Sequence, residues 1–358
     1  MAPGSASETL KNKVRIGSRT IGDGEPCFVI AEAGSNHNGS LGQAKKLIDV
    51  AAEAGADAVK FQMFRAPKLY PKSAGVSDYL QVPRSIYEII SEMEMPYEWI
   101  PELARHCEDR GVFFLSSVFD ERSADEVEAY VPAFKIASYE MTHTPLVEYV
   151  AGKGNPVIVS TGAAHLEEVA ATVEAFRRTG NDQLVLLQCT ARYPAPTDSL
   201  NLKAITVLKR EFGVPVGLSD HSTDPVLGPV TAVALGANVI EKHFTLSKEL
   251  PGPDHRFAVE PSELRLMVEK VREAERALGA EKKTVHPVEE ELRAFARRSV
   301  FAIRDIEAGE ELSTDNIAVL RNGKLPPGLP PQEYPGLLGR RAARPIRAEA
   351  AMHEADLA

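Results

Sequence analysis

The chain of 358 residues is poor in cysteine, has no long apolar run and carries no excess of positive charge. Its three cysteines, Cys27, Cys107 and Cys189, show no metal-type spacing, which favours buried thiols in a reducing cytoplasm. No apolar segment approaches the ~20 residues of a membrane span, and the polar segment 1–13 lacks the apolar core of a signal peptide. The formal net charge of -10 disfavours nucleic acid and anionic membranes as partners.

The chain does contain a regular alternation of short apolar runs and segments with helical periodicity. Strands are expected in segments 27–33, 58–64, 112–119, 134–138, 156–161, 184–190, 214–218 and 237–242. The matching helices are expected in segments 41–54, 97–110, 123–131, 146–151, 166–178, 202–212, 225–236 and 261–278. Eight βα units over roughly 250 residues have the size and order of a (β/α)₈ TIM barrel. A doubly wound sheet is the alternative, although it rarely needs eight evenly spaced units.

Other segments lie outside this pattern and divide the chain. Residues 1–26 predict an N-terminal extension with a small hairpin, and the barrel is expected to span 27–281. Residues 282–296 are rich in charge and predict a linker. Residues 297–358 alternate short strands, turns and a brief helix, which predicts a small α+β domain that can fold alone.

One connection, from Arg65 to Met95, is too long for an ordinary loop between a strand and its helix. It contains Tyr70, Tyr79, Tyr87 and several prolines. Long loops at the carboxyl end of a barrel often form lids or substrate walls. A solvated insertion is the alternative interpretation.

Two histidines occupy matching positions at the ends of the last two predicted strands. His221 follows Val-Pro-Val-Gly-Leu-Ser-Asp, and His243 follows Ala-Asn-Val-Ile-Glu-Lys. Parallel strands separated by one helix are neighbours, so the two imidazoles are expected side by side. Neutral imidazoles in this arrangement can share a divalent metal. The alternative is two unrelated polar residues at loop mouths.

Charged and hydroxyl side chains lie within or at the ends of other predicted strands. Lys60 and Lys135 would lie inside barrel strands, where a buried ammonium group needs an anionic partner. With the hydroxyls of Ser117, Ser138 and Ser219 they would form a cradle for phosphate or carboxylate. Pairing of the lysines with glutamates is the alternative. The dinucleotide-binding fingerprint Gly-x-Gly-x-x-Gly is absent from the sequence.

A further carboxylate, Glu32, follows the first strand and is expected to point into the barrel mouth. There it would serve as a general base or as a partner of metal-bound water. A structural pairing with one of the lysines is the alternative.

Six motifs lie at or near the ends of the predicted strands. They are Ile-Ala-Glu-Ala-Gly-Ser-Asn-His-Asn-Gly (30–39), Ala-Val-Lys-Phe-Gln (58–62), Lys-Ile-Ala-Ser (135–138), Gln-Cys-Thr-Ala-Arg-Tyr-Pro-Ala-Pro (188–196), Gly-Leu-Ser-Asp-His-Ser (217–222) and Glu-Lys-His-Phe-Thr (241–245). In this order they resemble the sialic acid (nonulosonic acid) synthase family, whose members condense phosphoenolpyruvate with an N-acylated aldose. The resemblance covers nearly the whole chain, and residues 298–357 resemble the C-terminal antifreeze-like (SAF) domain of that family.

The resemblance implies a role for each matching residue. His221 and His243 would bind a divalent metal, most often Mn²⁺, with Mg²⁺ and Co²⁺ as alternatives, and Glu32 would contact metal-bound water and the aldehyde. The residues that would bind phosphoenolpyruvate are Lys60, Ser117, Lys135, Ser138, Tyr193 and Ser219. The residues on the sugar side would be Gln62, Glu140, Asp254 and Arg321. The resemblance also implies a domain-swapped homodimer, in which the tail domain of one subunit caps the barrel of the other.

Three positions depart from the pattern of the family: Ala191, Arg192 and Asn322. They fall on the acceptor side, so the sequence leaves open which sugar is used, which metal fills the site and which pathway the protein serves. The resemblance predicts an N-acylated aldose such as N-acetylmannosamine or a 2,4-diacetamido-6-deoxy hexose. A condensing enzyme for an unusual or phosphorylated sugar, and a non-catalytic carbohydrate-binding barrel, are the alternatives.

Overall fold

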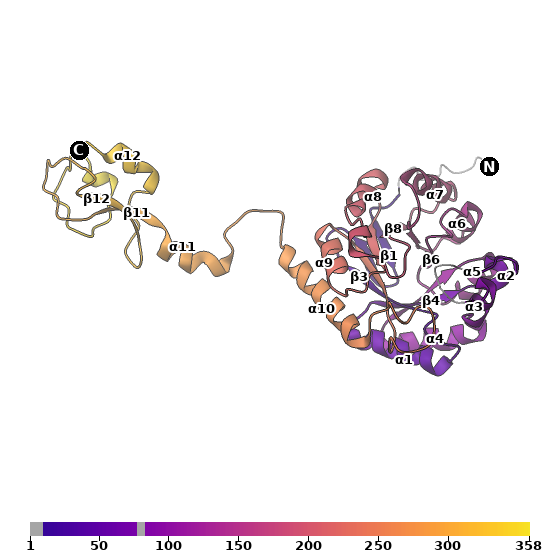
Figure 1. Cartoon of the computed structure of the whole chain (residues 1–358). Coiled ribbons are helices and arrows are strands. Elements are labelled where there is room, and N and C mark those ends of the chain that lie inside the picture. Colours follow the sequence, from indigo (N-terminus) through magenta and orange to yellow (C-terminus); the bar gives the residue numbers. More distant parts are fainter. Residues whose placement is uncertain (1–9, 77–82) are drawn as a thin grey trace. The chain divides into compact units, whose positions relative to one another are not determined.

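The computed structural model describes residues 10–76 and 83–358 (Figure 1). The chain divides into two compact units, Met1–Gly279 and Ala280–Ala358. Among the described residues, no helix combines the length and the apolar character needed to cross a membrane.

The first unit is built on a closed barrel of parallel strands, in the order β10-β3-β4-β5-β6-β7-β8-β9. The strands are β3 (Phe28–Gly34), β4 (Ala58–Met63), β5 (Phe113–Val118), β6 (Phe134–Ile136), β7 (Val157–Ser160), β8 (Leu184–Cys189), β9 (Val216–Asp220) and β10 (Val239–His243). The last strand pairs with the first, because His243 of β10 lies opposite Glu32 of β3. The predicted TIM barrel is therefore confirmed, and the doubly wound sheet is excluded because the sheet closes on itself.

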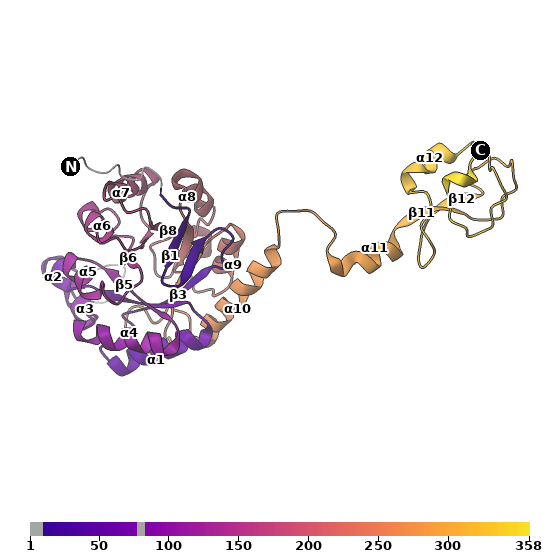
Figure 2. The ribbon, with the colours of Figure 1, turned by 180° about the vertical axis from the view of Figure 1, so that it is seen from behind.

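Helices surround this barrel (Figures 1 and 2). They are α1 (Leu41–Ala54), α4 (Ile100–Arg110), α5 (Glu121–Val127), α6 (Thr144–Ala151), α7 (Leu166–Arg178), α8 (Ala204–Phe212), α9 (Leu227–Ala234) and α10 (Pro261–Leu278). Local sequence determines where α1 begins and ends. The Ser40 side chain accepts a hydrogen bond from the backbone N–H of Gln43 at the start of the helix, and Gly55, with a φ of 83°, terminates it. The main apolar core lies between the strands and these helices.

The N-terminal hairpin closes one end of the barrel. Strands β1 (Lys13–Ile16) and β2 (Arg19–Gly22) pair antiparallel. The apolar side chains of Val14, Ile16 and Ile21 join a second buried cluster with inward-facing residues of the barrel strands. This packing covers the end at which the strands begin, so the carboxyl ends of the strands are left for a site.

The long connection after β4 contains two short helices, α2 (Ala66–Leu69) and α3 (Ile86–Glu92). The 3₁₀ turn η1 (Tyr97–Trp99) precedes α4, where a single helix was predicted over 97–110. Tyr79, predicted as part of this lid or wall, lies outside the described residues.

The second unit has a separate apolar core. In it β11 (Arg298–Ala302) pairs antiparallel with β12 (Ile317–Arg321), and α12 (Tyr334–Leu337) follows. The segment predicted as a linker includes the 3₁₀ turn η3 (Pro287–Glu289) and the helix α11 (Glu290–Ala296). The other 3₁₀ turns within residues 10–76 and 83–358 are η2 (Thr197–Ser199), η4 (Pro331–Glu333) and η5 (Glu354–Asp356).

Candidate active site

The predicted catalytic side chains come together at the carboxyl ends of neighbouring barrel strands. The register of the sheet sets Glu32 beside Lys60, Ser117 beside Lys135, and Glu241 beside Ser219. Because each pair comes from adjacent strands, the closed sheet fixes their spacing.

Lys60 is the centre of a buried polar cluster and is 2% exposed. Its Nζ lies 2.7 Å from Glu32 Oε2 and 3.7 Å from Glu241 Oε2, and it donates to Ser117 Oγ at 3.0 Å. Burial lowers the pKa of Lys60, but the charges of Glu241 and Glu32 outweigh this effect and raise it. The ammonium group is therefore charged, and the predicted alternative of a lysine–glutamate pair is present inside the site.

Lys135 approaches the same cluster from β6. Its Nζ donates to Ser160 Oγ at 2.7 Å and to the Ile136 carbonyl at 2.9 Å, and it lies 4.0 Å from Glu241 Oε1. Burial lowers the pKa of Lys135. A second anion at this position, such as a phosphate or carboxylate of a ligand, would stabilise the charged form.

Glu241 is the shared counter-ion of the two lysines, and the sequence analysis gave it no role. It accepts from Ser219 Oγ at 3.0 Å, while its Oε2 has no hydrogen-bond partner among the described residues. Burial raises the pKa of Glu241, but Lys135 and Lys60 outweigh burial and lower it. The signal in the sequence was its place on the strand that ends at His243.

Glu32 differs from Glu241 in the balance of these effects. Burial of the Glu32 carboxyl group outweighs the charge of Lys60 and raises the pKa of Glu32 to about 7. Gln62 Nε2 donates to Glu32 Oε1 at 2.8 Å. A carboxyl group that titrates near neutrality is suited to exchanging a proton with a reacting group.

The two predicted histidines lie side by side, with ring centroids 5.4 Å apart. His221 Nδ1 lies 3.0 Å from the Thr190 carbonyl and 3.7 Å from Cys189 Sγ. A proton on Nδ1 that bonds to this carbonyl leaves Nε2 of His221 as a lone-pair donor.

His243 fits a metal ligand on separate grounds. Burial lowers its pKa well below the usual value, so its imidazole is neutral, and its Nδ1 is buried without a hydrogen-bond partner among the described residues. Residues 10–76 and 83–358 contain no group of three or more His, Cys, Asp or Glu that could hold a metal ion. A cation held by His221 and His243 would therefore need water or substrate as further ligands.

Aromatic rings cover the histidines. The Tyr193 ring lies 4.1 Å from that of His221, and the Phe257 ring lies 5.2 Å from that of His243. Burial raises the pKa of Tyr193 well above its usual value, so its hydroxyl remains a donor. Phe257 was missed by the sequence analysis, because it lies in a loop where no periodicity marks it.

Gln62 and Asp254, two residues predicted to bind the sugar, lie in the barrel mouth with Glu32, and a third, Glu140, lies near enough to Lys135 for their charges to interact. A Cβ placed on Gly34 would come within 3.6 Å of the side chains of Asp254, Glu32 and Gln62, so these groups converge on its backbone. Burial raises the pKa of Asp254 to about 6 and that of Glu140 to about 7. Glu140 Oε2 is also buried without a hydrogen-bond partner in the described structure.

Two predicted residues remain to be placed. Ser138 Oγ accepts from the Gly162 backbone N–H at 3.0 Å, which brings it to the end of β7 beside Ser160. Arg321 is the last residue of β12 in the second unit, where it is exposed. It is the one predicted site residue outside the barrel unit.

Just behind the histidines lies a buried ion pair between the same two strands. Lys242 Nζ donates to Asp220 Oδ2 at 2.7 Å and to the Ser222 carbonyl at 2.7 Å. Asp220 precedes His221 and Lys242 precedes His243, so alternation along the strands sends these side chains to the opposite face. The pair ties the ends of β9 and β10 together from outside the barrel.

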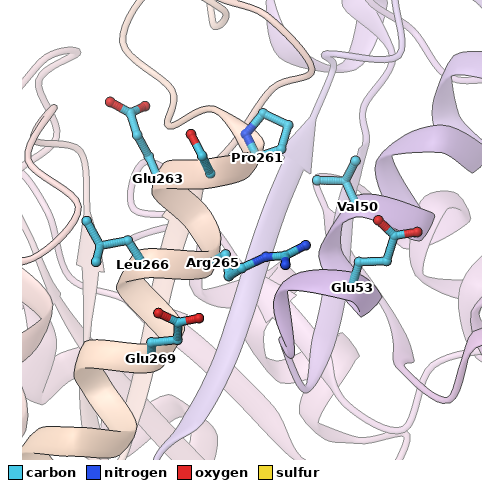
Figure 3. Close-up of a pocket in the computed structure, with 8 residues that line it drawn as sticks. Val50, Glu53, Pro261, Glu263, Arg265, Leu266 and Glu269 are labelled. Carbon is cyan, nitrogen blue, oxygen red and sulfur yellow. The ribbon is translucent and has the colours of Figure 1, made fainter.

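A cavity of about 610 Å³ lies on the outside of the barrel between α1 and α10 (Figure 3). Arg265 of α10 extends toward Val50 and Glu53 of α1, and Leu266 is a further lining residue from α10. It contains none of the predicted site residues and is separate from the barrel mouth.

The chain matches two known protein families and several known proteins. Residues 47–283 match the model of the NeuB family, and residues 297–358 match that of the SAF domain. The spore coat polysaccharide biosynthesis protein SpsE of Bacillus subtilis is 46% identical over an alignment of 352 residues, and the match covers 94% of each chain. The N,N'-diacetyllegionaminic acid synthase of Legionella pneumophila is 40% identical, over 94% of this chain and 96% of that protein.

Among solved structures, the N-acetylneuraminic acid synthetase of Leptospira borgpetersenii, in complex with citrate, matches with a TM-score of 0.72 at 31% identity. The match covers 80% of this chain and 96% of that one. The two family matches, the identities over most of the chain and the closed barrel all agree. The chain therefore belongs to the NeuB family of sialic (nonulosonic) acid synthases and carries a C-terminal SAF domain.

Proposed function

We propose that the protein condenses phosphoenolpyruvate with an N-acylated aldose and water, forms a nonulosonic acid and releases phosphate. The observation that carries this proposal is the pair of buried lysines, Lys60 and Lys135, whose ammonium groups lie on either side of Glu241, on the strand that ends at one of the paired histidines. The proposed condensation needs both an anion cradle for phosphoenolpyruvate and a cation that polarises the aldehyde.

The lysines and nearby hydroxyls would hold the anionic substrate. Phosphoenolpyruvate brings a phosphate and a carboxylate, and the donors available to them are Lys60, Ser117, Lys135, Ser138, Tyr193 and Ser219. Charged donors in a buried site bind such groups strongly and keep them in one orientation.

The proposed reaction joins the two substrates by a carbon–carbon bond and releases phosphate by breaking a carbon–oxygen bond. The C3 methylene of phosphoenolpyruvate forms a carbon–carbon bond to the aldehyde carbon, and water adds to the cationic C2. The bond between C2 and the phosphate oxygen breaks, and the lysines stabilise the charge of the departing phosphate. Glu32, with a pKa of about 7, would exchange a proton with the water or with the aldehyde oxygen.

We infer that His221 and His243 hold the divalent metal that the family resemblance implies, with Mn²⁺ first and Mg²⁺ or Co²⁺ as alternatives. A cation bound there would polarise the aldehyde oxygen. Gln62, Glu140 and Asp254 would orient the sugar by hydrogen bonds from the other side of the mouth. The three buried cysteines, which form no disulfide, agree with a cytoplasmic reaction.

The direct test is phosphate release. Purified protein with Mn²⁺ and phosphoenolpyruvate is expected to release phosphate only when an N-acylated aldose, such as N-acetylmannosamine or a 2,4-diacetamido-6-deoxy hexose, is added. Mass spectrometry should find a product that combines both carbon skeletons. Sugar binding without phosphate release would favour the non-catalytic barrel, and release with phosphorylated sugars alone would favour the alternative condensing enzyme.

We further propose a homodimer in which the SAF domain of each subunit completes the other subunit's site through Arg321. A barrel mouth that handles a cationic intermediate needs controlled access of water. The planar guanidinium of Arg321 could donate to an N-acyl carbonyl. Pairing of Arg321 with Glu310 or Glu311 was the structural alternative, but Glu310 pairs with Arg304 in the second unit.

This arrangement predicts complementation between two inactive variants. Arg321→Ala and Lys60→Met subunits should each be nearly inactive alone, because every site contains one lesion. Mixed dimers would hold one site with both lesions and one with neither, so about half of the activity per dimer should return. Phosphate release is measured after subunit exchange has been shown by mass spectrometry. A mixture that exchanges subunits and stays inactive would place Arg321 in its own subunit's site or in none.

A further inference from the structure

The buried ion pair behind the two histidines joins the ends of β9 and β10. Lys242 and Asp220 are each 1% exposed, and they lie directly opposite each other in the register of the two strands. His221 is the residue after Asp220, and His243 is the residue after Lys242. A single bond between Lys242 and Asp220 therefore connects the backbone positions from which both imidazoles project.

Asp220 also closes the turn that contains His221. Its Oδ1 accepts from the Ser222 backbone N–H at 2.8 Å, and its Oδ2 accepts from Ser222 Oγ at 3.1 Å. A carboxylate that bonds to the backbone two residues ahead holds a tight turn. Lys242 Nζ donates to Asp220 Oδ2 and to the Ser222 carbonyl, both at 2.7 Å. The residues on either side of His221 are thus bonded to one ammonium group of the next strand.

The imidazoles themselves are held by few polar contacts. His221 Nδ1 lies 3.0 Å from the Thr190 carbonyl, whereas His243 Nδ1 makes no hydrogen bond within the described residues. The position of the His243 ring therefore depends on packing and on the backbone of β10. A group that fixes this backbone relative to β9 acts on the separation of the two rings, whose centroids are 5.4 Å apart.

Helix α9 packs against the same carboxylate from outside the barrel. A Cβ added at Gly228 would lie 2.8 Å from Asp220 Oδ2, a distance at which one of the two groups must move. The carboxylate could move only by giving up its bonds to Lys242 and Ser222. Glycine at position 228 therefore permits the close approach of the helix to the ion pair.

We propose that Asp220 and Lys242 are positioning residues for the cation site: their bond fixes the separation and orientation of His221 and His243, and Gly228 leaves room for it. The inference rests on the proposed binding of a divalent metal by the two histidines. Alternation along the strands sends the side chains of Asp220 and Lys242 to the outer face, so they act through the backbone and do not touch the cation. Loss of such a supporting group typically weakens metal binding by about 10–100-fold.

The first test is Asp220→Asn, which keeps the size of the side chain and one oxygen for the Ser222 N–H but removes the charge that pairs with Lys242. Its Kd for Mn²⁺, measured by electron paramagnetic resonance, should be about tenfold above that of the wild type. The KM for phosphoenolpyruvate at saturating Mn²⁺ should not change, because the bonds of Asp220 are to Ser222 and Lys242 rather than to the anion cradle.

Asp57→Asn is the matched control. Asp57 likewise accepts from a backbone N–H, that of Val29 at 2.8 Å, and pairs with a cation, Arg272, at 2.9 Å. Its side chain is 9% exposed, and it precedes β4, at the end of the barrel away from the histidines. Asp57→Asn should lower the melting temperature and leave the Kd for Mn²⁺ unchanged. An equal loss of Mn²⁺ affinity in this control would mean that affinity follows general stability, and would overturn the proposal.

The double variant Asp220→Asn/Lys242→Met separates positioning from a purely structural role. It leaves no unpaired charge buried, so its melting temperature should recover in part compared with that of Lys242→Met. Its Kd for Mn²⁺ should stay about tenfold high, because the bond between the strands is still missing. Mn²⁺ affinity that recovers together with stability would show that the pair is only structural.

Gly228→Ala tests the same bond without removing a charge, and it keeps the proposal testable if Asp220→Asn folds poorly. Alanine favours a helix more than glycine does, but its Cβ would displace the Asp220 carboxylate. The Kd for Mn²⁺ should therefore rise by a few-fold. Wild-type affinity in both Gly228→Ala and Asp220→Asn would refute the positioning role.

Crystal structures distinguish failure of this inference from failure of the proposed metal site. If the wild type binds Mn²⁺ and Asp220→Asn binds it equally well, the metal site stands and the positioning role is rejected. If the wild type binds no Mn²⁺, the metal proposal fails, and the metal-free structures of the two proteins decide the inference. The rings of His221 and His243 should then lie at different separations in the two structures, and identical ring positions would overturn the positioning role.

Discussion

Replacing Lys60 by methionine is expected to lower kcat/KM for phosphoenolpyruvate by about 10²–10³-fold, which corresponds to roughly 3–4 kcal/mol of transition-state stabilisation. Methionine keeps the apolar stem of lysine and removes the charge that lies beside Glu32 and Ser117. Lys135→Met is expected to have a similar effect, because its ammonium group occupies the other side of Glu241. Initial rates of phosphate release over a range of phosphoenolpyruvate concentrations measure the loss.

Removing one partner of a buried pair also destabilises a protein, so folding must be checked. Lys153→Met is a suitable control, since Lys153 pairs with two carboxylates, Asp125 and Glu128, far from the barrel mouth. Circular dichroism should show folded protein for all three variants. If kcat/KM for phosphoenolpyruvate were unchanged in both Lys60→Met and Lys135→Met, the anion cradle would be in the wrong place.

Removal of divalent metal is expected to abolish turnover and to leave the fold intact. The barrel is closed by hydrogen bonds between its own strands and packs around its own apolar cores, so the fold is expected to survive without a cation between His221 and His243. Two imidazoles are too few for a closed structural zinc site, and the open positions suit an exchangeable ion. Protein dialysed against chelator should lose phosphate release, keep its circular dichroism spectrum and recover with Mn²⁺.

A readout independent of activity is Mn²⁺ binding by electron paramagnetic resonance. His243→Gln should bind Mn²⁺ at least tenfold more weakly than the wild type, consistent with the loss of one of two protein ligands. His106→Gln is the control, because His106 pairs with Asp49 on the outer helices. Full turnover of metal-free protein in excess chelator would refute the metal site.

The sequence predicted the barrel because its periodicities are strong and regular. The helix predicted over 261–278 has those bounds in the structure, since Pro261 fits the first turn and an amphipathic stripe follows. The residues at the strand ends followed from the same pattern, because parallel strands deliver their last residues to one face.

What the sequence could not predict depends on register and on loops. Glu241 lies between two lysines only because β10 pairs with β9 on one side and β3 on the other, which no local pattern specifies. Phe257 lies in an irregular segment, and tertiary contacts rather than a local pattern bring its ring to His243. Arg321 belongs to a separate unit, and a linker carries no signal for where that unit docks.

The pairing of β10 with β3 also has a consequence for how the protein acquires activity during folding. Glu32 and His243 become neighbours only when the first and last barrel strands meet, which is the contact with the greatest separation along the barrel sequence. Contacts of that kind form slowly, because the intervening chain must lose its freedom first. A chain that ended before β10 would contain both lysines but only one of the two histidines. If these histidines bind Mn²⁺ as proposed, the appearance of Mn²⁺ binding during refolding would report when β10 pairs with β3 and the barrel closes.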